Sequence, residues 1–316
     1  MKYLVVNSDD FGVCHSVNTG TLRAFREGIL TQASLMVPTP WFEEAVALAK
    51  EHRLPCGVHL TATCEWDLYR WRPLTHVKSF VEKDGTLAKS IQRVRRGGDR
   101  RELEREFAAQ IELAISRGIK PTHLDSHMWV MDSRVLIRLC RKYGILTHNT
   151  GANDVERLEP DVVFPLAGEA RCFSNFDDTN RKKAEFRKWL EGLCDGWHLA
   201  IVHVGEAGEE LASMASQTHP LSNWTQPYRM TDMELICDPE VRRWIDALGI
   251  QLANFGDYAG ALPPSATRPP DSLRQRPTTS TQVAGQDAPP SSRGGTGPKS
   301  AAGMVLGNLW SFLRRR

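Results

Sequence analysis

Short hydrophobic runs alternate with amphipathic segments along most of the chain. The hydrophobic runs predict strands at residues 3–7, 33–37, 56–62, within 118–127, and at 145–148, 197–203 and 250–255. Between them, apolar residues recur at helical spacing and predict helices at residues 16–27, 41–52, 99–117, 133–144, 180–194 and 238–248. Residues 64–98 carry neither pattern and are predicted to be irregular.

Regular alternation of strands and helices is typical of a parallel sheet that is covered by helices. Such a sheet is either open and doubly wound or closed as a (β/α) barrel. About seven strand–helix units over roughly 250 residues fit the barrel better. We therefore predict an α/β fold, a TIM-like (β/α) barrel, with a distorted ring as a variant of this prediction.

Ionisable side chains stand at the ends of four of the predicted strands. Asp9 and Asp10 follow the first strand, His59 ends the third, residues 123–127 (His-Leu-Asp-Ser-His) end the fourth, and His203 ends a late one. In both α/β architectures the functional groups gather at the carboxyl ends of the strands. We therefore expect these side chains to meet on one rim.

Two imidazoles and one carboxylate form a common open metal site, whose remaining positions take water and substrate. His59, His127 and one aspartate of the Asp9–Asp10 pair would supply these ligands. The other aspartate would stay free as a base, because a cation lowers the pKa of a water molecule that it binds. The residues alone leave the choice between Asp9 and Asp10 open.

Two further residues of the rim have expected roles in catalysis. Asp125 could orient a ligand histidine from behind, and His203 could protonate a leaving group. The alternative for Asp9 and Asp10 is a helix cap followed by a turn, and the alternative for residues 123–127 is a polar turn.

The net charge of +2 conceals an uneven distribution. From residue 261 onward, eight lysines and arginines stand against two aspartates, so the first 260 residues are mildly acidic. Because a nucleic-acid enzyme needs a basic surface, we expect no nucleic-acid partner.

Seven scattered cysteines without a CxxC pair are typical of reduced thiols. With an N-terminus (MKYLVV) that lacks a signal-peptide pattern and no apolar stretch of transmembrane length, these features predict a cytoplasmic protein.

The C-terminal region differs from the rest in composition. Residues 261–298 hold eight of the 18 prolines among Ser, Thr, Gly and Gln, and are predicted to be disordered. The chain then ends in GMVLGNLWSFLRRR, a short apolar run followed by three arginines. This end is either inert or binds an anionic membrane surface or a partner. We expect a catalytic domain over 1–260 and a tail over 261–316.

Five segments resemble one known family, the YdjC-like carbohydrate deacetylases. They read, in order, NSDDFGVCHSVNTGTLRAFREGILTQASLMV, GVHLTAT, THLDSHM, VHVGE and YRMTDMELICDPEVRRWIDALGIQLANFGDY. The resemblance covers roughly residues 1–258. It implies a barrel-like (β/α) fold that uses a divalent metal, usually Mg²⁺ and with Zn²⁺ as the alternative, to remove acetyl groups from N-acetylated sugars or oligosaccharides.

The resemblance also implies roles for individual residues. Its metal ligands correspond to Asp10, His59 and His127. Asp9 then becomes the base and His203 the acid, and Arg229 is the arginine expected just before the last helices. The resemblance thus selects Asp10 as the ligand and Asp9 as the base.

The chain departs from the family pattern on the substrate side of the rim. Trp129 stands where members often carry a second histidine, and residues 203–205 read His-Val-Gly where His-Pro-Gly is usual. An insertion at residues 64–74 carries Trp66 and Trp71. Because aromatic faces stack on sugar rings, we expect the three tryptophans to bind substrate, the insertion forming a lid or subsite wall; ordinary packing is the alternative.

Two rival functions remain at the level of the sequence. A site of two histidines and one carboxylate also occurs in non-haem iron oxygenases, although the strand–helix alternation here argues against that class. A sugar-binding relative without catalysis is the other alternative. The sequence also leaves a homodimer open.

Overall fold

The computed structural model describes residues 1–129, 132–148, 160–174, 178–214 and 226–261. Within them the strands are β1 (Lys2–Phe11), β2 (Gln32–Leu35), β3 (Cys56–Leu60), β4 (Leu124–Ser126), β5 (Arg171–Cys172), β6 (Gly196–Val202) and β7 (Ile250–Leu252). The α-helices are α1 (His15–Glu27), α2 (Phe42–His52), α3 (Ile91–Gly97), α4 (Arg100–Ser116), α5 (Ser133–Tyr143), α7 (Thr179–Glu191), α8 (Glu209–Ser213), α9 (Gln226–Ile236), α10 (Pro239–Ala247) and α11 (Phe255–Ala261). Short 3₁₀ turns lie at His127–Trp129 and Pro160–Val162. The predicted tail lies outside the described residues, except for Ala261.

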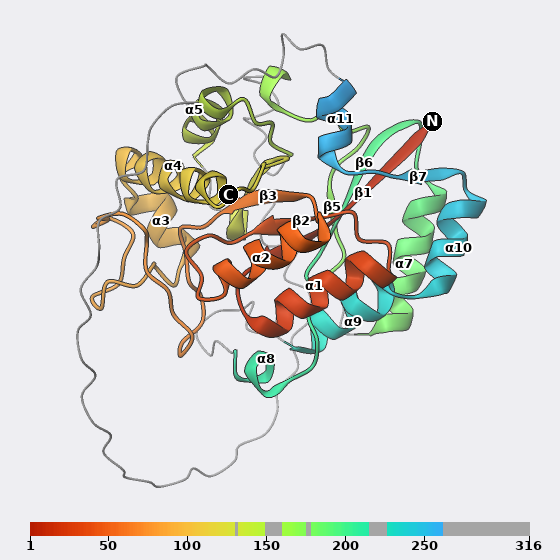
Figure 1. Ribbon diagram of the computed structural model, residues 1–316, viewed down its shortest axis with the longest axis horizontal. Coiled ribbons are helices and arrows are strands. Elements are labelled where there is room, and N and C mark those ends of the chain that lie inside the picture. The colour runs from red at the N-terminus through yellow and green to blue at the C-terminus, as the bar shows by residue number, and fades with distance from the viewer. Residues whose placement is uncertain (130–131, 149–159, 175–177, 215–225, 262–316) are drawn as a thin grey trace, which may run out of the picture. The chain divides into compact units, whose positions relative to one another are not determined.

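All strand pairs of the sheet are parallel, in the order β4-β3-β2-β1-β6-β5, and β7 pairs with the start of β1. Beyond β4, single bridges join Leu124 to Thr147 and Thr147 to Val163, and another joins Leu166 to Trp197 of β6. Among the described residues 145–148 and 160–166, these single bridges stand in place of a regular strand. The predicted α/β fold is confirmed, and the distorted form of the predicted barrel is a curled, half-barrel parallel sheet with helices (Figure 1).

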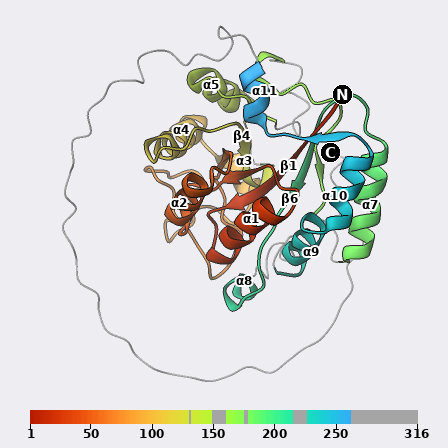
Figure 2. The ribbon, with the colours of Figure 1, turned by 45° about the vertical axis from the view of Figure 1, so that its right-hand side comes forward.

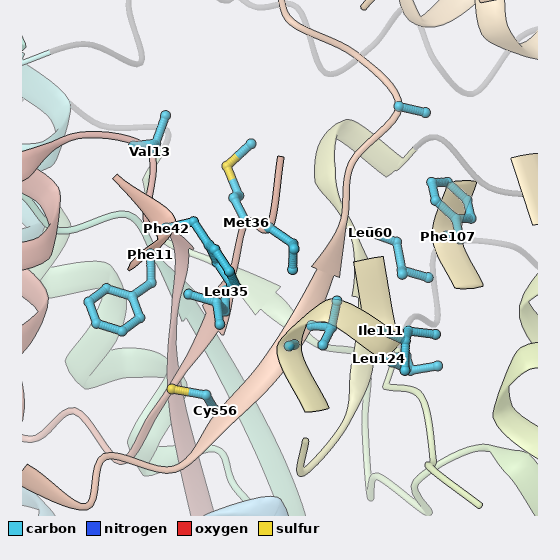
Figure 3. Close-up of a cluster of buried hydrophobic side chains, with 14 of the residues drawn as sticks. Phe11, Val13, Leu35, Met36, Phe42, Cys56, Leu60, Phe107, Ile111 and Leu124 are labelled. Atoms are coloured by element: carbon cyan, nitrogen blue, oxygen red, sulfur yellow. The ribbon is translucent and has the colours of Figure 1, made fainter. Parts of the chain in front are cut away.

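Helices cover the outside of the sheet (Figures 1 and 2). One hydrophobic cluster fills the space between strands β1–β4 and helices α1, α2, α4 and α5; Phe11, Leu35 and Phe42 lie in it (Figure 3). A second cluster packs β1 and β6 against α7, α9 and α10, and the rings of Phe173 and Phe186 are in contact within it. The carboxyl ends of the strands are thereby held on a rigid, buried frame.

Four helices begin at an aspartate whose carboxylate accepts backbone N–H groups of the first turn. They are α4, α5, α7 and α10, with caps at Asp99, Asp132, Asp178 and Asp238. Such a cap satisfies donors that have no partner within the helix. The helix predicted to begin at Asp99 is confirmed.

Helix α9 was not predicted from the sequence. Its buried positions mix polar with apolar residues, so the apolar stripe that marks an amphipathic helix is interrupted; they are Arg229, Thr231, Asp232, Met233, Leu235 and Ile236. The strand predicted at residues 145–148 is reduced to single bridges at Thr147. Residues 64–98, predicted to be irregular, contain helix α3.

No helix among the described residues is long and apolar enough to cross a membrane. All seven cysteines are free thiols.

The thiols should differ sharply in reactivity. Cys194 is exposed, whereas burial raises the pKa of Cys14, Cys56, Cys64, Cys140 and Cys172 to about 12. Because the thiolate is the reactive form, titration of the folded protein with a thiol reagent should show one fast thiol, Cys194, and two slower ones, the partly exposed Cys237 and Cys172. The four buried thiols should react only in denaturant. A fast phase that survives in Cys194→Ser would contradict this assignment.

Candidate active site

The end of β1 turns two successive aspartates toward the same place. In a regular strand Asp9 and Asp10 would point to opposite faces. The pairing of β1 with β2 shifts register between Ser8 and Phe11, and Asp10 has a φ of 67°, in the left-handed region. Irregularities of this kind re-aim side chains beside active sites. Asp9 and Asp10 consequently both face histidines at the ends of other strands of the sheet, and their exposed fractions are only 9% and 2%.

Asp10, His59 and His127 converge from three strand ends and are all buried. Asp10 Oδ1 lies 3.2 Å from His127 Nδ1 and 3.6 Å from His59 Nε2. One oxygen and two imidazole nitrogens therefore face a common point, and their ligand atoms lie within 4.8 Å of one another.

A cation fits this point chemically. Asp10 Oδ1 is buried and makes no hydrogen bond of acceptable geometry in the described part of the chain. A buried carboxylate oxygen without a partner is costly, and a cation shared with two imidazoles would satisfy it. The donor set, two nitrogens and one oxygen, is that of an open metal site.

Each of the two histidines has a carboxylate behind it. Asp125 Oδ1 lies 2.8 Å from His59 Nδ1, and both carboxylate oxygens of Glu65 lie 3.0 Å from His127 Nε2. The nitrogen that each ring turns away from Asp10 therefore has an acceptor for its proton. Such an acceptor fixes the tautomer and orientation of a ligand histidine.

Arg229, from α9, binds the other side of Asp10. Its Nη2 lies 2.5 Å from Asp10 Oδ2. Burial alone would raise the pKa of Asp10, but the guanidinium and the nearby His127 hold it well below its usual value. The Nε and Nη1 groups of Arg229 are buried and have no hydrogen-bond partner among the described residues. The arginine thus keeps Asp10 ionised and retains two donors for another group.

Asp9 and His203 lie beside the Asp10 cluster. Asn7 donates a hydrogen bond of 2.7 Å to Asp9 Oδ1, and Asp9 Oδ2 lies 3.8 Å from His203 Nε2 and 3.9 Å from His59 Nε2. Burial raises the pKa of Asp9 to about 7 and lowers the pKa of His203 to about 3. Near neutral pH, Asp9 can therefore hold or release a proton, and His203 is neutral.

The structure brings together the seven ionisable residues that the sequence predicted for the site: Asp9, Asp10, His59, Asp125, His127, His203 and Arg229. The tryptophans differ. Trp66 and Trp71 are buried, with exposed fractions of 5% and 3%; Trp66 lies nearly parallel to the His127 ring, and Trp71 donates its indole N–H to the carbonyl of Thr63. An indole so enclosed offers little face to a sugar ring. The side chain of Trp129 lies outside the described residues.

Sequence reasoning missed Glu65, although it stands between Cys64 and Trp66 in the insertion that drew attention for its aromatic residues. It gave no role to His148, whose Nε2 lies 3.2 Å from Asp125 Oδ2. Glu65 could have been found as an ionisable residue that follows a predicted strand. His148 ends the predicted strand at residues 145–148, so it met the same criterion as the other histidines at strand ends.

Comparisons of the sequence with known proteins point to one family. The sequence profile described as YdjC-like protein matches residues 3–247. A carbohydrate deacetylase from Brevibacillus brevis is 42% identical, over 80% of this chain and 98% of that protein. A carbohydrate deacetylase from Geobacillus stearothermophilus is 30% identical over 81% and 98%. Among solved structures, a putative cellobiose-phosphate cleavage protein from Enterococcus faecalis superposes with a TM-score of 0.69 at 26% identity, over 81% and 98%.

Proposed function

The chain belongs to the YdjC-like family, and on this premise we propose that it is a metal-dependent carbohydrate deacetylase that removes acetyl groups from N-acetylated sugars. The observation that carries the proposal is the convergence of Asp10, His59 and His127, with Asp9 beside them. The names of the relatives support a carbohydrate substrate, including a chitooligosaccharide deacetylase from Yersinia enterocolitica that is 27% identical over 81% of this chain and 99% of that protein. We assign catalysis to residues 1–260, which contain all of these side chains, and treat 261–316 as a tail.

Asp10, His59 and His127 would hold the metal. A divalent cation there would polarise the acetamide carbonyl and lower the pKa of the attacking water. The family resemblance implies Mg²⁺, which prefers oxygen ligands and would keep several waters, whereas two imidazoles suit Zn²⁺. Both ions therefore belong in the test.

The protein's own groups would handle the protons. Asp9, with a pKa raised to about 7 by burial, accepts a proton from the attacking water. Arg229 can donate from Nη1 or Nε to the carbonyl oxygen as negative charge develops on it. As the C–N bond breaks, the proton leaves Asp9, and His203 Nε2, 3.8 Å away, relays it to the sugar nitrogen within the same step, because an imidazole whose pKa burial lowers to about 3 does not hold a proton by itself near neutral pH. Water thus supplies the hydroxyl of the released acetate and the proton of the free amine.

Acetate release tests the proposal. Purified protein is incubated with N-acetylglucosamine and with N-acetylated chito-oligosaccharides of two to five units, and acetate is measured enzymatically alongside mass spectrometry of the sugar. A mass loss of one acetyl group with matching acetate is expected in wild type and not in His59→Ala. Sugar binding without acetate from any of these substrates, in metal-loaded protein, would instead indicate a non-catalytic sugar-binding relative.

Glu65→Gln should weaken metal binding about 10- to 100-fold, because the His127 ring loses the carboxylate that orients it and increases its basicity. Isothermal titration of metal-stripped protein with Zn²⁺ measures this. The matched control is Glu104→Gln, which removes an exposed carboxylate that is paired with Arg138. Equal affinities of Glu65→Gln and wild type would remove Glu65 from the site.

A further inference from the structure

Three buried side chains lie in a row behind His203 and are not used by the mechanism above. Ser174 Oγ, just after β5, lies 2.8 Å from His203 Nδ1. The same hydroxyl donates to Asp232 Oδ2 of α9, and Asp232 forms an ion pair with Lys182 of α7. The exposed fraction of Ser174 is 1%, and those of Asp232 and Lys182 are 0%.

The hydrogen-bond donors in this row can be assigned from simple chemistry. Asp232, paired with Lys182, only accepts: Oδ2 takes the hydroxyl proton of Ser174 and the backbone N–H of His203 at 2.6 Å. A serine hydroxyl has one proton, so Ser174 must accept its bond from His203. The proton of a neutral His203 therefore lies on Nδ1.

The other nitrogen of the ring then carries the lone pair. His203 Nε2 faces Asp9 Oδ2 at 3.8 Å, on the reaction side of the ring. Only this tautomer can take up a proton at Nε2 and pass it on there. The opposite tautomer would point an N–H at Asp9 and leave the basic nitrogen buried against the hydroxyl.

We propose that Ser174, held by the Asp232–Lys182 ion pair, is a positioning residue that fixes the tautomer of His203 and keeps Nε2 available for proton transfer. The catalytic meaning of this assignment rests on the proposed deacetylase function, whereas the tautomer itself does not. Three segments distant in sequence, the residues just after β5, helix α7 and helix α9, each supply one member of the row. A role in packing alone would require the burial of these groups but not this order of donors and acceptors.

The tautomer can be read directly from long-range ¹H–¹⁵N spectra of protein labelled at histidine. The His203 signals are assigned by their loss in His203→Gln. Wild type should show a proton on Nδ1 of His203, and Ser174→Ala should shift the population toward Nε2–H. His198 is an internal reference, because its Nε2 lies 2.8 Å from the carbonyl of Cys194, which can only accept; its signals should not change. Ser16→Ala, which removes another buried hydroxyl bonded to a carboxylate, is the matched control.

Kinetics supply the second readout. Ser174→Ala should lower kcat by at least about tenfold with KM changed by less than about twofold, since proton transfer is impaired and sugar binding is not. A wild-type His203 with its proton on Nε2 would overturn the inference even if the variant did not fold, and so would an unchanged tautomer in Ser174→Ala. If the tautomer changes as expected but wild type releases no acetate, the positioning row stands and the proposed function fails.

Discussion

Asp9→Asn is expected to lower acetate release by about a hundredfold to ten-thousandfold, the usual contribution of a general base. The amide keeps the shape of the side chain and its contact with Asn7 but cannot accept the proton of the attacking water. Metal affinity should stay close to that of wild type, because the proposed ligands are Asp10, His59 and His127. The measurement combines kcat for acetate release with titration of the metal into stripped protein.

Asp10→Asn is the matched variant and should behave in the opposite way. It changes the oxygen that faces both imidazoles and should weaken metal binding, with activity returning in part at high metal concentration. If Asp9→Asn lost the metal and Asp10→Asn kept it, the two aspartates would have exchanged roles.

Lys182→Met should destabilise the fold by about 3–5 kcal/mol, because it leaves the buried carboxylate of Asp232 without its charge partner. Adding Asp232→Asn removes that charge while an amide oxygen can still accept from Ser174 and the backbone of His203. The double variant should therefore recover more than half of the lost stability. Urea unfolding of the two variants and wild type measures the difference in the free energy of unfolding, provided that the dependence of this free energy on urea concentration has the same slope in all three proteins.

An exposed ion pair is the control for the Lys182 series. Arg187→Met breaks the pair with Glu191 on the same helix, where both side chains are more than half exposed, and should cost less than about 1 kcal/mol. A double variant that is less stable than Lys182→Met alone would show that the Asp232 charge is not what makes the single change costly.

The order of strands and helices could be predicted from the sequence because the spacing of apolar residues along the chain reflects which face of each element is buried. The helix beginning at Asp99 carries its apolar residues at the spacing that packing requires, and its cap is a local signal. Helix α9 escaped detection because it buries Arg229 and Asp232, whose partners come from β1, α7 and the segment after β5. In the irregular part of the ring, a strand was predicted at residues 145–148, but the structure has only single bridges from Thr147 to Leu124 and Val163, because pairing depends on distant segments as well as on a local apolar run.

The site residues likewise fall into those that the sequence could predict and those that it could not. Residues at strand ends, such as His59 and His203, could be placed on one rim because parallel strands end on the same side. The register shift that directs the side chains of Asp9 and Asp10 to the same site depends on pairing with β2, and no local sequence pattern predicts it. Glu65 and Ser174 act through contacts between distant segments, which spacing along the chain does not encode. Trp66 and Trp71 were expected at the substrate, but their burial depended on packing that a sequence cannot reveal.

The most direct measurement is a stoichiometric titration of metal-stripped protein with Mg²⁺, Zn²⁺, Mn²⁺ or Co²⁺, with acetate release from an N-acetylated chito-oligosaccharide followed at each addition. The site built from Asp10, His59 and His127 predicts no acetate without metal and a rise with at least one of these ions that saturates at one bound ion per chain. Full acetate release by protein shown to be free of metal would contradict a metal-dependent mechanism at this site.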